Sequence, residues 1–215
     1  SRLLSPGELL EQLSEDGSLL TSRRRDVPTR HRSLWGVFDH TWERLGSRER
    51  QALPLLAVFR EGFDLEAAER VAGADIYTLL ALLDRKLVRR TGERRFALHE
   101  LVRQYALQRC RAEGLVERAR NAHSRHYCRL LARLTPDLKG ADVAAGLERV
   151  QADIANIVAA WEHAAEAGEV AALDAAREGL DHYFYYRARF ATAAALFARA
   201  VRTAEEAETA AAGSD

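Results

Sequence analysis

In the stretch LVRRTGERRFALH, residues 87–99, the spacing of apolar residues changes from the period of a helix to that of a strand. Val88 lies on one side of a Thr-Gly-Glu turn, and Phe96 and Leu98 lie on the other side. Two short apolar segments joined by a glycine-containing turn are typical of a β-hairpin. We therefore predict a small two-stranded hairpin in this stretch.

Two helical patterns begin the region before the hairpin. The first has its apolar residues between positions 33 and 45 and stops at Gly46. Ser47 is placed to cap the second, because a serine hydroxyl can accept a hydrogen bond from a free N–H at a helix start. Pro54 lies inside this second pattern and lacks a backbone N–H, so we expect it to kink the helix or split it.

Two more helical patterns lie closer to the hairpin, and one follows it. Asp64 is expected to cap the third helix, which stops at Gly73. The fourth runs from Ile76 to Leu87, and the helix after the hairpin covers roughly 100–113. Several helices followed by a hairpin predict a winged-helix domain over residues 31–113.

The regions on either side have different patterns. Residues 3–20 predict one short helix, followed by a basic connector, so we assign residues 1–30 to the end of a larger helical domain. Residues 114–215 predict helices only, and the last two alternate small and large apolar residues, as closely packed repeat helices do. The predicted fold class is mainly α: a winged-helix domain with a small β-hairpin, then an α-helical repeat array. The helices expected in this array are 115–134 (ending at Thr135-Pro136), 142–167, 169–186 and 189–207, with Ala193, Leu196, Phe197, Ala200 and Val201 packed between the last two.

Composition excludes several classes of protein. The 215 residues are 47% hydrophobic and 30% charged, and their formal net charge is zero. Nothing in this balance attracts nucleic acid or an anionic membrane. No apolar run approaches the length of about 20 residues that a membrane span needs. Cys110 and Cys128 form no ligand pair, which fits a reducing compartment, so we expect a cytoplasmic protein without a membrane partner.

The pair His99-Glu100 invites a catalytic interpretation, which its neighbours contradict. A zinc protease helix needs His-Glu-x-x-His, and here Arg103 stands where the second histidine would be. Adjacent side chains at a strand-to-helix junction point in different directions, and no serine or cysteine nucleophile is marked nearby. We predict no catalytic residue and no metal site.

Two other groups of residues suggest sites less strongly. His123, His126 and Cys128 lack a fourth ligand, and we interpret the histidines as partly buried surface residues. The run HYFYYRARF (182–190) could line a ligand pocket or pack between two repeat helices, and we favour packing. Its candidate partner-binding residues are Tyr183, Tyr185, Tyr186 and Phe190.

Several blocks resemble, in order, the winged-helix segment of bacterial STAND signal-transduction ATPases. This family of NB-ARC-type regulators includes activators of antibiotic biosynthesis. The resemblance continues into the beginning of their tetratricopeptide-like sensor region at GLERVQADIANIVAAWEHAAEAGE (146–169). The winged-helix blocks are VPTRHRSLWGVFDHTWERL (27–45), LAVFREGFDLEAAERVAG (56–73), LLALLDRKLVRR (79–90) and RRFALHELVRQYA (94–106).

The resemblance implies a role for His99. Leu98-His99-Glu100 matches the family's Met-His-Asp motif, whose histidine contacts the β-phosphate of ADP bound in a neighbouring domain. His99 would then sense ADP, and Glu100 would orient its imidazole or cap the helix. ADP or ATP with magnesium would be held by an upstream nucleotide-binding domain, and no cofactor is expected on residues 1–215 alone. The implied partners are this upstream domain and a small-molecule or protein inducer on the repeats.

Two alternative functions remain. The first is a DNA-binding winged helix, which would place residues 75–86 in the major groove. This segment is nearly neutral, whereas a groove-reading helix is rich in Arg, Lys, Asn or Gln, so we do not expect DNA as a partner. Arg89, Arg90, Arg94 and Arg95 of the hairpin could still contact phosphates. The second alternative is a protein-interaction scaffold.

Overall fold

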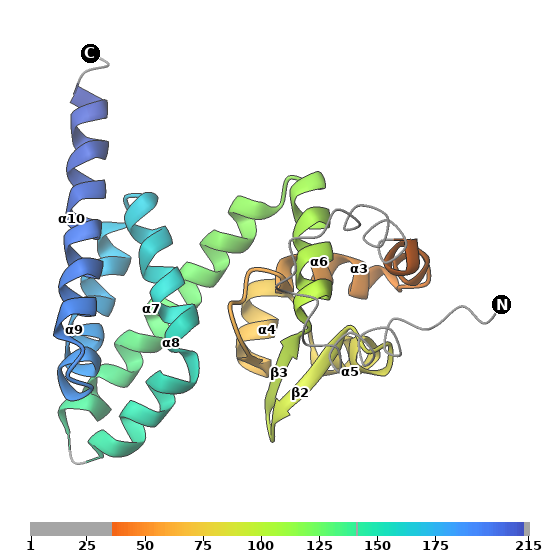
Figure 1. Cartoon of the computed structure of the whole chain (residues 1–215), viewed down its shortest axis with the longest axis horizontal. Helices are drawn as coiled ribbons and strands as arrows, with labels where there is room; N and C mark the ends of the chain where they lie inside the picture. The colour runs from red at the N-terminus through yellow and green to blue at the C-terminus, as the bar shows by residue number, and fades with distance from the viewer. Residues whose placement is uncertain (1–35, 141, 213–215) are drawn as a thin grey trace, which may run out of the picture. The chain divides into compact units, whose positions relative to one another are not determined.

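The structure is a computed structural model that describes residues 36–140 and 142–212. The described chain is mainly α-helical, with one small antiparallel sheet, and it divides into two compact units (Figure 1). The first unit contains residues 36–58 and 62–116; the second contains Phe59–Glu61 and residues 117–212. The helix and connector expected over residues 3–32 lie outside the described residues.

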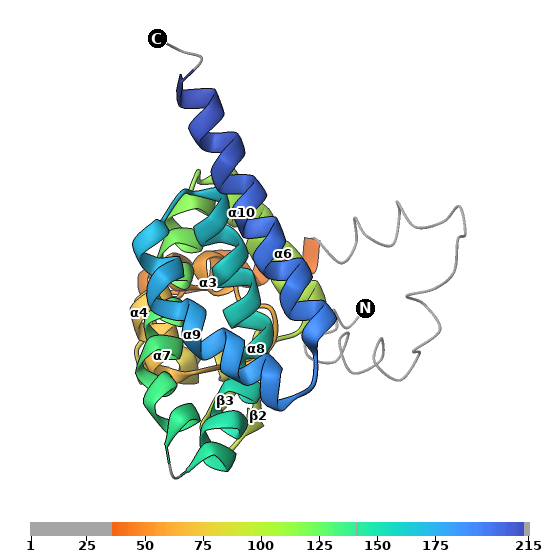
Figure 2. The ribbon, with the colours of Figure 1, turned by 90° about the vertical axis from the view of Figure 1, so that its left-hand side faces the viewer.

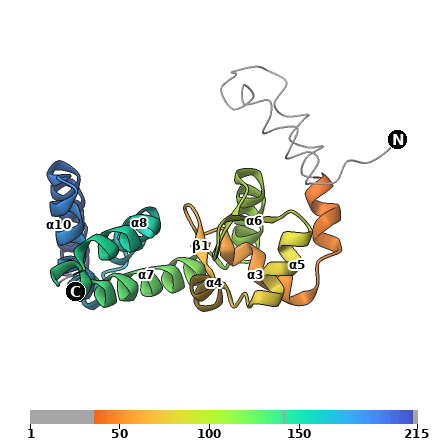
Figure 3. The same ribbon diagram turned by 90° about the horizontal axis from the view of Figure 1, so that it is seen from below.

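In the first unit, helix α3 (Ser47–Leu56) packs against α4 (Leu65–Ala72), α5 (Ile76–Asp84) and α6 (Glu100–Ala112) (Figure 3). Leu53 and Leu56 of α3 are almost fully buried, as are Leu79 and Leu82 of α5, so apolar burial holds these helices together. The unit also contains a helix at residues 36–43. Its strands are β1 (Phe63–Asp64), β2 (Val88–Gly92) and β3 (Arg95–Leu98).

The predicted hairpin is confirmed, but it belongs to a three-stranded sheet. β2 pairs with β3 in the antiparallel sense, with Val88 opposite Leu98. The additional strand is β1, in which Phe63 lies opposite Phe96, and the strand order is β1-β3-β2. A two-residue strand shows no alternation of apolar and polar residues, so sequence periodicity could not reveal β1.

Local capping signals were correct at Asp64 and wrong at Ser47. The carboxylate of Asp64 accepts a hydrogen bond from the Ala67 N–H at 2.8 Å and caps α4, as predicted. The cap of α3 is Gly46 instead of Ser47. Here the Glu49 carboxylate reaches back and accepts from the N–H of Gly46 itself at 2.7 Å.

The expected break at Pro54 does not occur. α3 continues through Pro54 to Leu56, and the prediction that this helix would be split was wrong. A proline in the last turn removes only one N–H, and the neighbouring Leu53 and Leu55 are buried in the core. Their burial outweighs the single lost hydrogen bond.

The second unit is built from four long helices. α8 (Val143–Glu166) packs against α9 (Val170–Tyr186) and α10 (Phe190–Ala212), which also contact one another (Figure 2). The aromatic side chains of Tyr127, Tyr183 and Phe184 are among the most deeply buried in this unit. The fourth helix of this unit is α7 (Val116–Lys139).

The stop predicted at Thr135-Pro136 was also wrong, because α7 continues to Lys139. Leu134 and Leu138 are buried on either side of the proline. The Thr135 hydroxyl donates to the Leu131 carbonyl at 2.9 Å and ties the turn that contains Pro136 to the preceding one. Burial of both leucines therefore favours continuing the helix at the cost of one backbone bond.

α10 differs from its prediction in length and in its packed face. It runs to Ala212 and not to 207. Ala193, Leu196 and Ala200 are buried as expected, whereas 57% of Val201 is exposed. Val201 therefore lies on the outer side of α10, and its assignment to the packed interface was wrong.

No described helix is long and apolar enough to cross a membrane.

Candidate functional site

His99 lies at the junction between β3 and α6 in the first unit. It is the N-cap residue of α6, and its Nδ1 accepts a hydrogen bond from the Leu101 N–H at 3.4 Å. The imidazole is half-buried. A ring nitrogen that accepts a hydrogen bond carries no proton, so the proton of the neutral ring is on Nε2. His99 therefore presents one N–H donor, on the ring nitrogen that does not cap the helix.

The surroundings of His99 keep its imidazole neutral. Burial is the main reason that its pKa lies below the ordinary value, and the nearby Arg89 guanidinium lowers the pKa further. Glu100 opposes this shift. A neutral histidine beside an arginine and at a helix start is a combination of donors and positive potential that suits an anion such as a phosphate.

Glu100 interacts mainly with its own helix. Its carboxylate accepts from the Arg103 guanidinium at 2.8 and 2.9 Å and from the Gln104 amide at 2.9 Å. These contacts hold the pKa of Glu100 below its usual value. Arg103, the residue in the sequence position of a zinc protease's second histidine, is thus bound to Glu100. The role of Glu100 in orienting the His99 imidazole remains a prediction.

The four aromatic candidates of the second unit belong to two different environments. Tyr183 is fully buried, and its hydroxyl donates to the Gln151 side chain at 2.6 Å, so it packs between helices. Tyr185, Tyr186 and Phe190 are 63%, 47% and 59% exposed. Tyr185 contacts both other rings edge-on, with centroids 5.6 Å from Tyr186 and 6.0 Å from Phe190. The packing that we favoured therefore applies to Tyr183, and the other three form an exposed cluster.

The histidines of α7 are core residues, which corrects their interpretation as partly buried surface residues. His123 and His126 are only 2% and 7% exposed. The His123 ring lies against Phe59 and Tyr127, and its Nε2 is 3.2 Å from the side-chain oxygen of Asn156. Asn156 is buried and accepts from the Arg60 N–H through the same oxygen, at 2.9 Å.

This geometry identifies the tautomer of His123. The amide oxygen of Asn156 can only accept, so Nε2 of His123 must donate to it. Burial lowers the pKa of His123 to about 4, and His126, Arg60 and His163 act in the same direction. The ring is therefore neutral near pH 7. Burial likewise raises the pKa of the Cys128 thiol to about 11. Among the described residues, no group of three or more Asp, Glu, His or Cys side chains could hold a metal ion.

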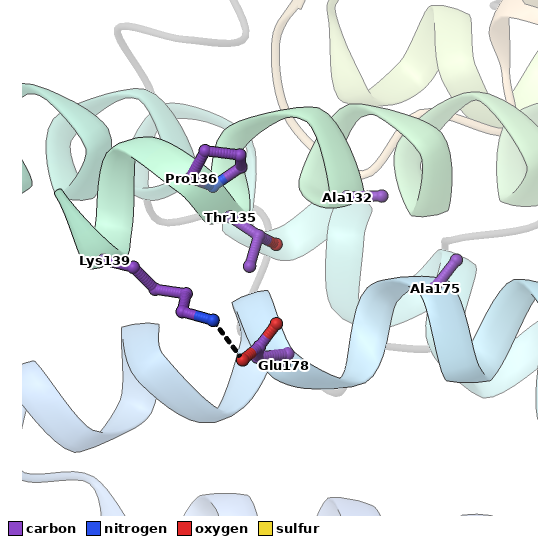
Figure 4. Close-up of a pocket in the computed structure, with 6 residues that line it drawn as sticks. All are labelled: Ala132, Thr135, Pro136, Lys139, Ala175 and Glu178. Carbon is purple, nitrogen blue, oxygen red and sulfur yellow. Dashed lines mark hydrogen bonds and ion pairs between the residues drawn. The ribbon is translucent and has the colours of Figure 1, made fainter.

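A cavity of about 410 Å³ lies between α7 and α9, and the sequence did not suggest it (Figure 4). Lys139 and Glu178 form a 2.7 Å ion pair at this cavity. Both side chains are half-exposed, so the pair stabilises the unit only slightly. The other lining residues are Ala132, Thr135, Pro136 and Ala175.

Several polar residues of α5 and its ends, the segment expected to enter a DNA groove, form contacts inside the first unit. Asp75 caps α5 by accepting from the Thr78 N–H and hydroxyl at 2.8 and 2.7 Å, and these bonds are the main cause of its lowered pKa. The Arg85 guanidinium lies 3.7 Å from the Glu49 carboxylate. Arg95 of the hairpin donates to the Gly62 carbonyl at 2.9 Å. The polar residues of segment 75–86 outside these contacts are Tyr77, Asp84 and Lys86. Their formal charges cancel, so they provide no net positive charge toward DNA.

We therefore expect negligible binding of duplex DNA. In a gel shift at physiological salt the chain should give no complex at micromolar concentration, which is the range typical of non-specific binders. A sub-micromolar, salt-sensitive complex that disappears when Arg89, Arg90, Arg94 and Arg95 are replaced by alanine would contradict this expectation.

Comparison of the chain with family models, with curated proteins and with solved structures gives no match. The functional interpretation therefore depends on the residues and geometry described above.

Proposed function

We propose that the chain is a non-catalytic regulatory segment of a STAND-type ATPase. Its first unit would be the winged-helix domain and its second the beginning of a tetratricopeptide-like sensor. The first unit would report whether ADP or ATP occupies an upstream nucleotide-binding domain, and the helices of the second would bind the inducer or partner. Sequence resemblance suggests this function, and the geometry of His99 is the observation that supports it best.

The protonation of the His99 ring supports its proposed role as an ADP sensor. Its ring is neutral, its Nδ1 caps α6, and its Nε2 carries a proton. Nε2–H can donate to a phosphate oxygen without a change of protonation near pH 7. Arg89 and the start of α6 contribute positive potential close to the same ring. These are the properties that an ADP sensor at this position needs.

His99 alone is too weak to hold a nucleotide. One hydrogen bond to a charged group contributes about 1.5–3 kcal/mol, whereas a micromolar site needs about 8 kcal/mol. We therefore expect calorimetry to detect no ADP binding to residues 1–215. Tight ADP binding by this chain would contradict the proposal, because the nucleotide site would then lie within it.

The decisive experiment uses the longer protein that contains the proposed nucleotide-binding domain. Replacing His99 by alanine should weaken ADP binding about 10- to 100-fold, as expected for the loss of one such hydrogen bond. It should also increase activity without inducer, because the ADP-bound resting state loses stability. Displacement of a fluorescent ADP analogue measures the first effect.

Matched variants separate sensing from capping. His40 is an exposed histidine on the helix at residues 36–43, so His40→Ala should leave ADP affinity unchanged. In His99→Asn the shorter amide can still cap α6 but loses the Nε2–H donor, and we expect it to keep the melting temperature while ADP affinity falls. If His99→Ala lowers the melting temperature yet leaves ADP affinity and inducer dependence intact, His99 only caps its helix.

A further inference from the structure

Arg89 and His99 lie on the same face of the small sheet. β2 and β3 are side by side (Figure 1), and Arg89 of β2 is opposite Ala97 of β3. Residues that are opposite one another in an antiparallel pair have their side chains on one face. His99 follows Ala97 by two positions, and its φ of −67° and ψ of 146° continue the extended backbone, so its ring is on this face as well. Diagonal neighbours of this kind are about 7–8 Å apart, which an arginine side chain can span.

The guanidinium of Arg89 is available to an anion. The side chain is exposed, and among the residues that the structure describes it forms no ion pair and no hydrogen bond. Other arginines of this unit are bound to protein groups, as Arg103 is to Glu100 and Arg109 is to Asp39. The charge of Arg89 nevertheless reaches the imidazole, because it lowers the pKa of His99.

The two side chains supply different parts of what a phosphate needs. The neutral ring of His99 offers one directional N–H donor and no charge. A terminal phosphate carries about 1.5–2 negative charges near pH 7, which a neutral donor does not compensate. A guanidinium is permanently charged, and its paired N–H groups match two phosphate oxygens. Arg89 therefore provides the charge that His99 lacks.

We propose that Arg89 is a second phosphate-binding residue of the His99 site. Its guanidinium binds the same phosphate group that accepts a hydrogen bond from Nε2 of His99. This inference rests on the proposed function, in which the phosphate belongs to ADP. The alternation of β2 assigns the role to Arg89 and not to Arg90. Arg90 is opposite Phe96 and lies on the other face, where its guanidinium is 6.0 Å from the centre of the Phe96 ring.

NMR titration of the chain with inorganic pyrophosphate, at constant ionic strength, tests the contact without an upstream domain. The His99 signals, identified by their loss in His99→Ala, should shift and saturate in the millimolar range, because two contacts fall short of a micromolar site. Arg89→Gln should weaken this binding at least about tenfold. Arg90→Gln removes the same charge from the opposite face and should change it less than about threefold, because solvent screens exposed charges. Equal effects of Arg89→Gln and Arg90→Gln, or no saturable shift of His99, overturns the proposal.

ADP affinity in the longer protein separates this proposal from the proposed function. Displacement of a fluorescent ADP analogue should show that Arg89→Gln weakens ADP binding about 10- to 100-fold, as His99→Ala does, whereas Arg90→Gln does not. Circular dichroism shows that each variant is folded. If only His99→Ala weakens ADP binding, the role of Arg89 is overturned and the function of His99 stands. If neither Arg89→Gln nor His99→Ala weakens it, the proposed function fails, and the role of Arg89 in binding ADP fails with it.

Discussion

Replacing Gly179 of α9 by alanine is expected to destabilise the second unit. A Cβ atom at this position would lie 2.5 Å from the Thr135 hydroxyl oxygen and 2.9 Å from Cγ of Leu131. Both neighbours are buried, and the Thr135 hydroxyl is hydrogen-bonded to the Leu131 carbonyl. Overpacking of this kind costs about 1–3 kcal/mol, against a gain in helix propensity of about 1 kcal/mol. Because contacts this short require a backbone shift, we expect a cost at the upper end of this range, about 3 kcal/mol, and hence a net loss of about 2 kcal/mol.

Urea denaturation measures this loss, and neighbouring variants identify its cause. Gly179→Ala combined with Thr135→Ala removes the closest contact, so the pair should be less destabilising than the sum of the single changes. Glu178→Ala at the adjacent exposed position breaks only the half-exposed ion pair with Lys139 and should cost less than about 1 kcal/mol. A neutral or stabilising Gly179→Ala would show that α7 and α9 are not packed as closely as described.

Acidification from pH 7 to pH 4 is expected to lower the free energy of unfolding of the second unit by about 3 kcal/mol through His123 alone. The pKa of this histidine falls from 6.5 in the unfolded chain to about 4 in the folded one. Between these values the unfolded state binds more protons than the native state. Stability is therefore complete above pH 6.5 and declines as the pH falls toward 4.

The pH dependence is specific to the His123 ring. His123→Phe keeps an aromatic ring among Phe59 and Tyr127 but cannot be protonated. It should lose stability at pH 7, because Asn156 loses its bond from His123, yet stability should fall less between pH 6.5 and 4. Thermal melting at several pH values gives both quantities. Equal slopes for wild type and His123→Phe over this range would mean that His123 is accessible to protons in the native state.

The position of His99 shows how far sequence can define a site. A histidine directly after a strand pattern and before a helix pattern is expected at the helix start, and the structure confirms that His99 caps α6. The local sequence does not reveal which ring nitrogen bonds the backbone, nor that Arg89 on the neighbouring strand affects the same ring. Both depend on the pairing of β2 with β3.

Local signals in the sequence determined the boundaries of most elements. The hairpin of β2 and β3, the Asp64 cap and the helix ends at Gly73 and Gly114 were predicted, and both of these glycines adopt positive φ values of 64° and 67°. The expected Thr-Gly-Glu turn was misplaced, because Thr91 and Gly92 belong to β2 and the turn is at Glu93 and Arg94. A cap or a turn involves residues within a few positions of each other, so the chemistry that decides it is present in the sequence.

Tertiary packing decided what local signals could not. Pro136 should end a helix, yet α7 continues because Leu134 and Leu138 are buried by the rest of the unit. His123 and Val201 have ordinary sequence environments, but one is buried and the other is exposed. Burial depends on which distant segments cover a given face, and the free energy gained by removing apolar surface from water exceeds most local preferences. For this protein the sequence therefore determined where most helices and the β2–β3 hairpin lie, and the tertiary structure decided which of their side chains form the core and which remain exposed.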